Sequence, residues 1–256
     1  MPTAVIIGAS SGLGREIALT YIRRGYRIGV AARRIERLDA LVGEAPERVV
    51  AGMVDVTTDD APARLESLIH ALGAPVDIFI NCAGIGFANP MLDPKADIDT
   101  VKTNCLGFTR VTDFMFNYFA DNSLKGQIVA ISSVAGTRGI GIAASYSASK
   151  RFQSEYLTAL SQLAHQRSLP VTITDIKPGF VDTPLLDAHT KYPMMMNTGR
   201  AAALIVKAID RRRSRIIDLR WAMVVALWRC VPGFVWRRMR LRLSATDNKE
   251  LITSKR

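Results

Sequence analysis

The sequence contains few cysteines and no long apolar run. Cys82, Cys105 and Cys230 are its three cysteines among 256 residues, and their scattered spacing matches neither a disulfide framework nor a metal-binding pattern. We therefore predict no metal site and a reducing, cytoplasmic compartment. The apolar residues from Ala4 to Ile7 run directly into glycines with no basic segment before them, so they are predicted to form a buried strand rather than a secretory signal.

The chain has almost no excess of positive charge before its C-terminal segment. The net charge is +11, but residues 1–210 contain 21 lysines and arginines against 20 acids, whereas residues 211–256 contain 13 against 3. A nearly neutral body with a basic tail places any function of the positive charge in the tail.

Short apolar, β-branched runs alternate with longer amphipathic stretches along the chain. The runs predict strands at Val5–Gly8, Arg27–Ala32, Val49–Val54, Ile78–Asn81, Gln127–Ser132, Val171–Lys177 and Ser214–Leu219, with helices near 12–24, 35–43, 59–72, 97–119 and 145–167. Continuous apolar runs are typical of strands buried on both faces, and a regular strand–helix order implies parallel strands. The sequence thus predicts one α/β domain over residues 1–215, a doubly wound parallel β-sheet with helices on both faces, followed by an extension over residues 216–256.

A glycine-rich loop follows the first predicted strand. It contains Gly8, Ser10, Ser11, Gly12, Leu13 and Gly14. Glycines permit a tight turn and let backbone N–H groups approach a pyrophosphate, and the start of the following helix favours negative charge. The spacing G-x-x-x-G-x-G differs from the usual dinucleotide fingerprint, and a loop that only turns the chain is the alternative.

Arg33 and Arg34 end the second predicted strand, and no acidic residue stands before Glu36. At this place an acid would bind the ribose 2′-hydroxyl of NAD, whereas an arginine accommodates the 2′-phosphate of NADP. The sequence therefore favours NADP(H) over NAD(H), with Arg33 as the phosphate ligand and Arg15 as a second positive charge. A solvated helix start is the alternative interpretation of the arginine pair.

Tyr146 and Lys150 lie four residues apart in a predicted helix and therefore on one face of it. An ammonium near a phenol lowers the tyrosine pKa from about 10, so that the phenol can exchange a proton with a substrate oxygen. Ser133 follows a predicted strand, at the end where doubly wound folds bind ligands. Tyrosine–lysine pairs also occur on ordinary surfaces, so the prediction depends on the combination with Ser133.

These motifs together resemble the short-chain dehydrogenase/reductase family. The resemblance covers roughly residues 3–210 and rests on the glycine loop, Asn81-Cys82-Ala83-Gly84, Asn104, Ser133, Tyr146-x-x-x-Lys150 and Pro178-Gly179. It implies a Rossmann-type fold with a seven-stranded parallel sheet and hydride transfer between a nicotinamide and a carbonyl or alcohol carbon. It also implies a homo-oligomer.

The resemblance further implies roles for individual residues. Tyr146 is similar to the general acid/base, Lys150 to the residue that lowers the tyrosine pKa and holds the nicotinamide ribose, and Ser133 to the group that polarises the carbonyl. Asn104 resembles the asparagine that supports a water-linked proton relay. The other implied cofactor residues are Asp55 and Val56 at the adenine, Asn81, Ala83 and Gly84 at the adenosine ribose, and Pro178, Gly179, Val181 and Thr183 at the nicotinamide.

Two positions depart from the family pattern. Ile7 stands where a threonine usually precedes the first glycine, and Cys82 replaces the second asparagine before Ala83-Gly84. The hydrogen bonding around the cofactor loop is therefore expected to differ. We interpret Cys82 as a small buried residue rather than a reactive thiol.

A methionine-rich segment, Tyr192-Pro193-Met194-Met195-Met196, lies in the stretch that forms a mobile lid in the family. Flexible methionines suit apolar ligands of varied shape, which favours a hydrophobic, lipid-like ketone as substrate. An equally good interpretation is that the methionines fill a gap beneath this lid.

The C-terminal extension combines arginines with tryptophans. Residues 211–243 contain ten arginines, including Arg242, and one acid, Asp218, beside Trp221, Trp228 and Trp236. Arginines and Pro232-Gly233 interrupt the apolar residues, so the segment is not predicted to span a membrane. Peripheral contact with anionic lipid on the inner face of a membrane and packing on the enzyme or a second subunit both stay open. Nucleic acid is not expected, because phosphate contacts would not require the tryptophans.

The sequence therefore predicts an NADP(H)-dependent oxidoreductase that reduces a hydrophobic ketone. The alternative is a non-catalytic NADP-binding protein that acts through its basic tail. The presence of Asn104, Ser133, Tyr146 and Lys150 argues against this alternative.

Overall fold

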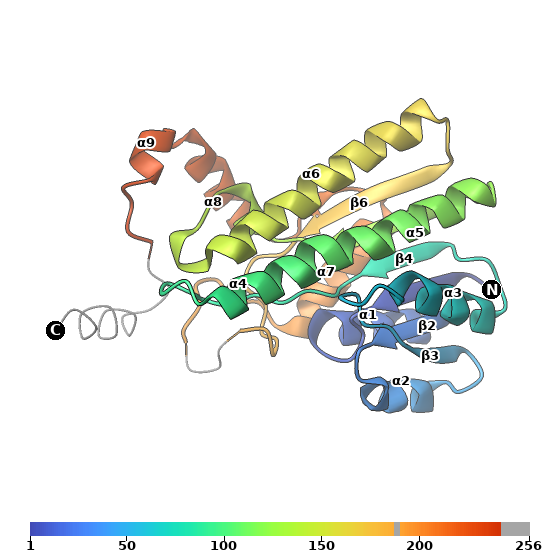
Figure 1. Cartoon of the computed structure of the whole chain (residues 1–256). Coiled ribbons are helices and arrows are strands. Elements are labelled where there is room, and N and C mark those ends of the chain that lie inside the picture. The colour runs from blue at the N-terminus through green and yellow to red at the C-terminus, as the bar shows by residue number, and fades with distance from the viewer. Residues whose placement is uncertain (187–189, 242–256) are drawn as a thin grey trace.

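Seven parallel strands form one sheet in the order β3-β2-β1-β4-β5-β6-β7 in the computed structural model, which describes residues 1–186 and 190–241 (Figure 1). The strands are β1 (Thr3–Ile7), β2 (Arg27–Ala32), β3 (Val49–Met53), β4 (Ile78–Asn81), β5 (Gly126–Ile131), β6 (Val171–Lys177) and β7 (Arg215–Ile216). The predicted doubly wound, Rossmann-type fold is thus confirmed. The strand order reverses between β1 and β4, and doubly wound sheets bind ligands outside the carboxyl ends of the strands at such a point.

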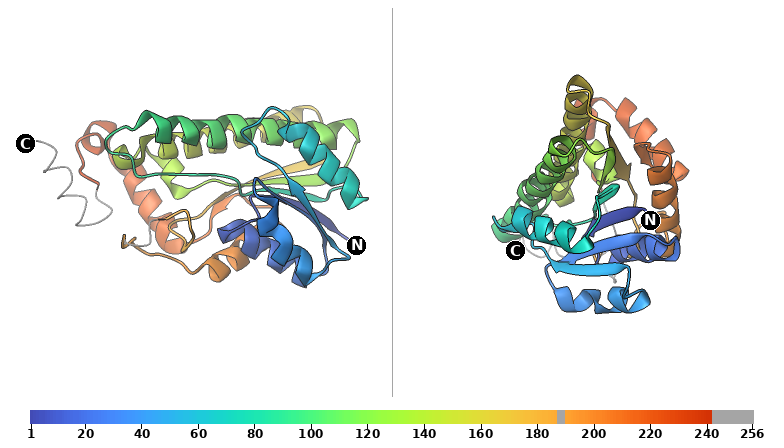
Figure 2. Two further views of the ribbon diagram at one scale, coloured as in Figure 1. Left: turned by 60° about the horizontal axis from the view of Figure 1, so that its bottom comes forward. Right: turned by 90° about the vertical axis from the view of Figure 1, so that its right-hand side faces the viewer.

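Helices cover both faces of the sheet (Figure 2). On one face, α1 (Gly12–Arg23) and α7 (Thr198–Asp210) bury Ile17, Ile205 and Ile209 against the strands. On the other face, α3 (Ala61–Leu72), α5 (Phe108–Asp121) and α6 (Ala144–Gln166) bury residues that include Leu65 and Phe119. Both faces of the sheet are therefore apolar, which explains the continuous apolar runs of its strands.

Some elements differ from the sequence prediction. The helix expected near 97–119 is divided into α4 (Pro94–Val101), a π-helical segment (Lys102–Gly107) and α5. The helix expected near 35–43 begins as a 3-10 turn (Ile35–Leu38) before α2 (Asp39–Glu44). The last strand, expected at Ser214–Leu219, is shorter, because the Asp218 carboxylate accepts a hydrogen bond from the Arg220 N–H and caps a helix that begins at Leu219.

The C-terminal extension adds α8 (Leu219–Cys230) and α9 (Gly233–Trp236) beside the carboxyl ends of the strands, far from the N-terminus (Figure 1). Across residues 1–186 and 190–241, no helix is both long and apolar enough to cross a membrane. Arg242, named above among the arginines of the extension, lies outside the described residues.

Candidate active site

Ser133, Tyr146 and Lys150 meet beyond the carboxyl end of β5. Ser133 is the N-cap of a short turn (Val134–Thr137), and its hydroxyl accepts a hydrogen bond of 3.1 Å from the Ala135 N–H. Tyr146 and Lys150 stand in successive turns at the start of α6. The Ser133 hydroxyl lies close enough to the Tyr146 phenol to act on its pKa, and Lys150 Nζ lies 5.8 Å from the centre of the Tyr146 ring. The structure therefore brings together three of the residues that the sequence singles out, while their catalytic roles stay predictions.

The pKa of Tyr146 is not lowered, contrary to the sequence prediction. Burial raises this pKa above its ordinary value, and the hydrogen bond from Ser133 opposes the shift. Lys150 donates instead to the Ile131 carbonyl at 3.0 Å and to Gln153 Oε1 at 2.9 Å. Burial lowers the pKa of Lys150 to about 8, and the Asp175 carboxylate opposes that shift. In this arrangement the ammonium is directed to a backbone and an amide acceptor rather than to the phenol.

Gln153 accepts a hydrogen bond from Lys150, and Asn104 in turn binds Gln153. Asn104 is fully buried in the π-helical segment. Its side-chain amide exchanges hydrogen bonds with the backbone of Ile85, at 2.9 and 2.7 Å, and donates to Ser149 Oγ at 3.0 Å. Gln153 Nε2 donates to the Asn104 carbonyl at 2.9 Å. Asn104 therefore positions the loop after β4 against α6, and its part in a proton relay stays a prediction.

Sequence reasoning did not find Gln153. The signal was available, because Gln153 stands three residues after Lys150 and so shares its helix face. Its amide has one acceptor and two donors, which suits a place between an ammonium and a carbonyl.

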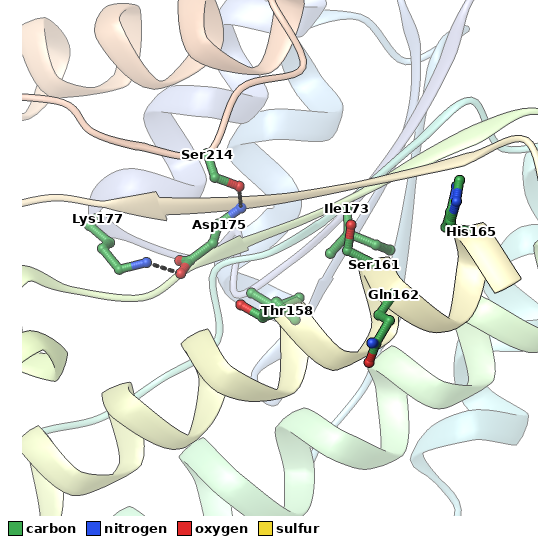
Figure 3. A pocket seen from close by; sticks show the side chains of 9 residues that line it. Thr158, Ser161, Gln162, His165, Ile173, Asp175, Lys177 and Ser214 are labelled. Carbon is green, nitrogen blue, oxygen red and sulfur yellow. Dashed lines mark hydrogen bonds and ion pairs between the residues drawn. The ribbon is translucent and has the colours of Figure 1, made fainter.

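A network of polar side chains begins at Ser132, the residue before Ser133. The Asp175 carboxylate accepts a hydrogen bond from the Ser132 hydroxyl. It also accepts one from the Lys177 ammonium, and the Asp175 N–H donates to Ser214 Oγ at 2.8 Å (Figure 3). Asp175 and Lys177 line a cavity of about 460 Å³ between α6 and β6. None of the predicted catalytic or cofactor residues lines this cavity, so it is separate from the candidate active site.

The glycine loop forms a cradle at the start of α1. Gly8 and Gly12 have φ angles of +81° and +54°, which favour glycine, and a methyl group on Gly14 would lie 2.2 Å from the Gly8 carbonyl oxygen. Ser11 makes no side-chain cap, and the first turn contains no acid. The N–H groups at this helix start therefore face no competing anion from their own turn, and the cradle fits the pyrophosphate of a dinucleotide.

Asn81 adds an unpaired donor on the adenosine side. Its Oδ1 accepts from the Ala83 N–H at 3.0 Å, whereas its Nδ2 is buried without a partner among the described residues. A methyl group on Gly8 would lie 2.7 Å from the Ala83 nitrogen, so the two loops are in close contact. Buried donors are nearly always satisfied, and a ribose hydroxyl would satisfy this one.

The remaining adenosine residues take different positions. Asp55 Oδ1 accepts hydrogen bonds from the Thr57 N–H and hydroxyl, at 2.9 and 2.7 Å, and Val56 packs against Gly107. Arg33 is exposed at the end of β2, and its side chain has no hydrogen-bond or ion-pair partner within residues 1–186 and 190–241. Arg15 lies 3.6 Å from the Glu16 carboxylate.

The segment Pro178–Thr183 connects the serine turn to the glycine loop. The Pro178 carbonyl accepts from the Val134 N–H at 3.0 Å, and a methyl group on Gly12 would lie 3.3 Å from Thr183 Cβ. Val181 bridges to Met196 of the methionine-rich segment. A nicotinamide held by this segment would lie between the pyrophosphate cradle and Ser133.

The two residues that depart from the family pattern, Ile7 and Cys82, both have packing roles. Ile7 is buried in the core, and its carbonyl accepts from the Cys82 N–H at 2.9 Å. Burial raises the pKa of the Cys82 thiol to about 12, so the thiolate that reacts as a nucleophile is scarce. This agrees with the interpretation of Cys82 as a packing residue.

Residues 2–192 match the family model for short chain dehydrogenases. The chain belongs to this family. It is therefore an NAD(P)-dependent oxidoreductase that acts on CH–OH or C=O groups of a small-molecule substrate. This short-chain dehydrogenase is 34% identical to an uncharacterized oxidoreductase of Myxococcus xanthus over 230 residues, which cover 87% of this chain and 89% of that protein.

Two solved structures that contain NADPH are also similar to this short-chain dehydrogenase. A variant of the actinorhodin polyketide ketoreductase has a TM-score of 0.66 and 29% identity, over 88% of this chain and 89% of that one. A short-chain dehydrogenase from Sphingobium yanoikuyae has a TM-score of 0.74 and 25% identity, over 96% of this chain and 99% of that one.

Proposed function

We propose that this protein uses NADPH to reduce the carbonyl group of a hydrophobic ketone. The observation that carries the proposal is that the Ser133 hydroxyl and the Tyr146 phenol meet beside the buried Lys150. The Ser133 hydroxyl donates to the ketone oxygen and stabilises the charge that develops on it. Tyr146 then gives its proton to that oxygen. A raised pKa keeps the phenol protonated at neutral pH, which suits an acid in the direction of reduction.

NADPH, when bound, supplies the hydride, and the chain supplies its binding groups. The glycine loop holds the pyrophosphate, Asn81 Nδ2 the adenosine ribose, and Pro178–Thr183 the nicotinamide side. Arg33 supports the preference for NADP, because its guanidinium is exposed, lacks a protein partner in the described chain and lies where no acid stands. The two similar structures that contain NADPH agree with this preference.

Peripheral contact with a membrane is the second part of the proposal. Leu219, Met223 and Leu227 lie four residues apart on α8 and are 75%, 56% and 72% exposed, so they form an apolar stripe. Arg237 and Arg238 follow in the same extension. An apolar stripe beside arginines suits the surface of an anionic bilayer, where an apolar ketone would also collect. The alternative is that a second copy of the chain packs on this stripe in a homo-oligomer.

Cofactor titration tests the first part. Wild-type protein is expected to bind NADPH at least about tenfold more tightly than NADH, and Arg33→Ala to lose this preference, since a charged hydrogen bond contributes about 1.5–3 kcal/mol. Arg34→Ala is the matched control and is expected to keep it. Tyr146→Phe should bind NADPH normally and lose about 10²–10⁴-fold in ketone reduction. NADPH binding by the wild-type protein without turnover of any ketone would instead support the non-catalytic alternative.

Vesicle flotation tests the second part. The wild-type chain is expected to float with phosphatidylserine vesicles and not with phosphatidylcholine vesicles, and Met223→Lys should weaken flotation. A protein that stays unbound but sediments as a dimer, and becomes monomeric in Met223→Lys, would assign the stripe to a subunit interface.

A further inference from the structure

The tail helix α8 packs directly on the segments that carry the candidate active site. Trp221 is 6% exposed and Val225 is 2% exposed. Both are packed in one cluster with Val134, the residue after Ser133. The Trp221 ring also meets the Phe180 ring edge-on at 5.5 Å. One face of α8 thus covers the serine turn and the segment Pro178–Thr183.

Further contacts hold the extension in this place. Trp228 Nε1 donates to Thr137 Oγ1 at 3.1 Å, and Trp236 Nε1 donates to the Gly139 carbonyl at 2.8 Å. Arg138 donates to the carbonyls of Arg229 and Val231, at 2.9 and 2.6 Å. The segment from Thr137 to Gly139, which leads from Ser133 towards Tyr146, is therefore fixed by the tail.

Trp221 differs from the other two tryptophans. Its indole N–H is buried and has no hydrogen-bond partner within the described part of the chain. A methyl group on Gly179 would lie 2.1 Å from this nitrogen, 2.2 Å from Cδ1 and 2.7 Å from Cε2, so the five-membered ring packs against the backbone of the predicted nicotinamide segment. Proteins seldom keep a buried donor unpaired unless a ligand or a water supplies the acceptor.

We propose that α8 forms one wall of the substrate site and that the Trp221 indole N–H donates a hydrogen bond to a carbonyl-type oxygen of the bound reactants. This inference rests on the proposed function. The oxygen belongs either to the ketone or to the carboxamide of the nicotinamide. Phe180 and Met194, which pack against the same cluster, extend the wall with apolar surface. The wall therefore suits a ketone that carries an alkyl chain or an aromatic ring.

The test compares Trp221→Phe with Trp228→Phe, which changes the same residue type on the same helix. Three quantities are measured: the thermal unfolding midpoint, the Kd for NADPH, and kcat/KM for a series of straight-chain 2-alkanones. Trp221→Phe is expected to lower the midpoint less than Trp228→Phe does, because it costs packing of the ring but the removed N–H has no protein partner. Trp228→Phe is expected to lower it, because Thr137 loses its bond.

The Kd for NADPH and kcat/KM together distinguish the two sources of the oxygen. If the ketone accepts the bond, Trp221→Phe binds NADPH normally and loses about tenfold in kcat/KM. If the carboxamide accepts it, the Kd for NADPH rises about tenfold in the absence of any ketone. In either case Ala226→Ser, at an exposed position of the same helix, retains the wild-type value within about twofold.

Three results would overturn the inference. In the first, Trp221→Phe leaves both ligand quantities unchanged. In the second, its midpoint falls as far as that of Trp228→Phe, which would mean a structural partner for the N–H. In the third, the wild-type protein binds NADPH but reduces no 2-alkanone, so that the wall does not accept alkyl ketones. A wild-type protein that fails to bind NADPH would overturn the proposed function itself, and this inference with it.

Discussion

Lys150 and Gln153 form a buried pair in α6, with Lys150 Nζ donating to Gln153 Oε1 at 2.9 Å. The other end of the same amide donates to the Asn104 carbonyl at 2.9 Å. A buried ammonium is costly without acceptors, and the Ile131 carbonyl supplies only one more. Gln153 therefore fixes the lysine and the π-helical segment relative to each other.

Gln153→Leu is expected to destabilise the protein by about 1–3 kcal/mol, because it removes an acceptor from Lys150 and a donor from Asn104. The kcat for ketone reduction should fall more than KM changes, since Lys150 loses its fixed position. Urea unfolding and steady-state kinetics measure both effects. Gln162→Leu, on an exposed position of the same helix, is the control and should change neither. Equal behaviour of the two variants would contradict this role for Gln153.

The lowered pKa of Lys150 predicts a pH-dependent stability. Its pKa is about 8 in the folded chain against an ordinary value of 10.5. Between about pH 8 and 10 the unfolded state holds more protons at this residue, so its contribution to the free energy of unfolding rises with pH, by at most about 1.4 kcal/mol per unit. Below about pH 8 both states are protonated and the slope disappears.

Lys150→Met should lack this slope. The wild-type protein is therefore expected to gain stability relative to Lys150→Met as the pH rises from about 8 to 10, and to show a constant difference from about pH 6 to 7.5. Urea unfolding of both proteins at several pH values measures this. A difference that stays constant up to about pH 10 would mean that the lysine titrates normally.

Gly86 and Tyr146 allow a test of the tyrosine's position. A methyl group on Gly86 would lie 2.3 Å from Cδ2 of the Tyr146 ring, so Gly86→Ala must displace the ring from Ser133. Turnover is expected to fall about 10²-fold, as for small misplacements of catalytic groups, while NADPH binding persists. Gly141→Ala, with no atom within 4 Å of the added methyl group, is the control. Normal turnover in Gly86→Ala would show that the ring position is not critical.

Gly14 and Gly43 provide a matched pair of helical glycines. Alanine at position 14 would place its methyl group 2.2 Å from the Gly8 carbonyl oxygen, a backbone atom, whereas the space around Gly43 is open. Gly14→Ala should lower the thermal midpoint and abolish NADPH binding. Gly43→Ala should bind NADPH normally and gain up to about 1 kcal/mol from helix propensity. If Gly14→Ala bound NADPH at wild-type affinity, the glycine loop would not be part of the cofactor site.

The fold was predictable because its signals are local. Apolar runs such as Arg27–Ala32 and Ile78–Asn81 coincide with β2 and β4, since strands buried on both faces require mostly apolar residues. The short β7 was less predictable, because the Asp218 cap competes with the strand for the same residues. The division of the helix near 97–119 also left no clear pattern in the sequence.

The sequence by itself determined the family, the strand and helix order, and the places of Ser133, Tyr146 and Lys150 at the end of one strand and the start of one helix. These features follow from residue type and short spacing. Only the tertiary structure decided that Gln153 supports Lys150, that burial raises the pKa of Tyr146, and that Trp221 lies on Gly179. The reason is physical: desolvation and contact between residues distant in the chain depend on how the elements pack, and no local pattern encodes that packing.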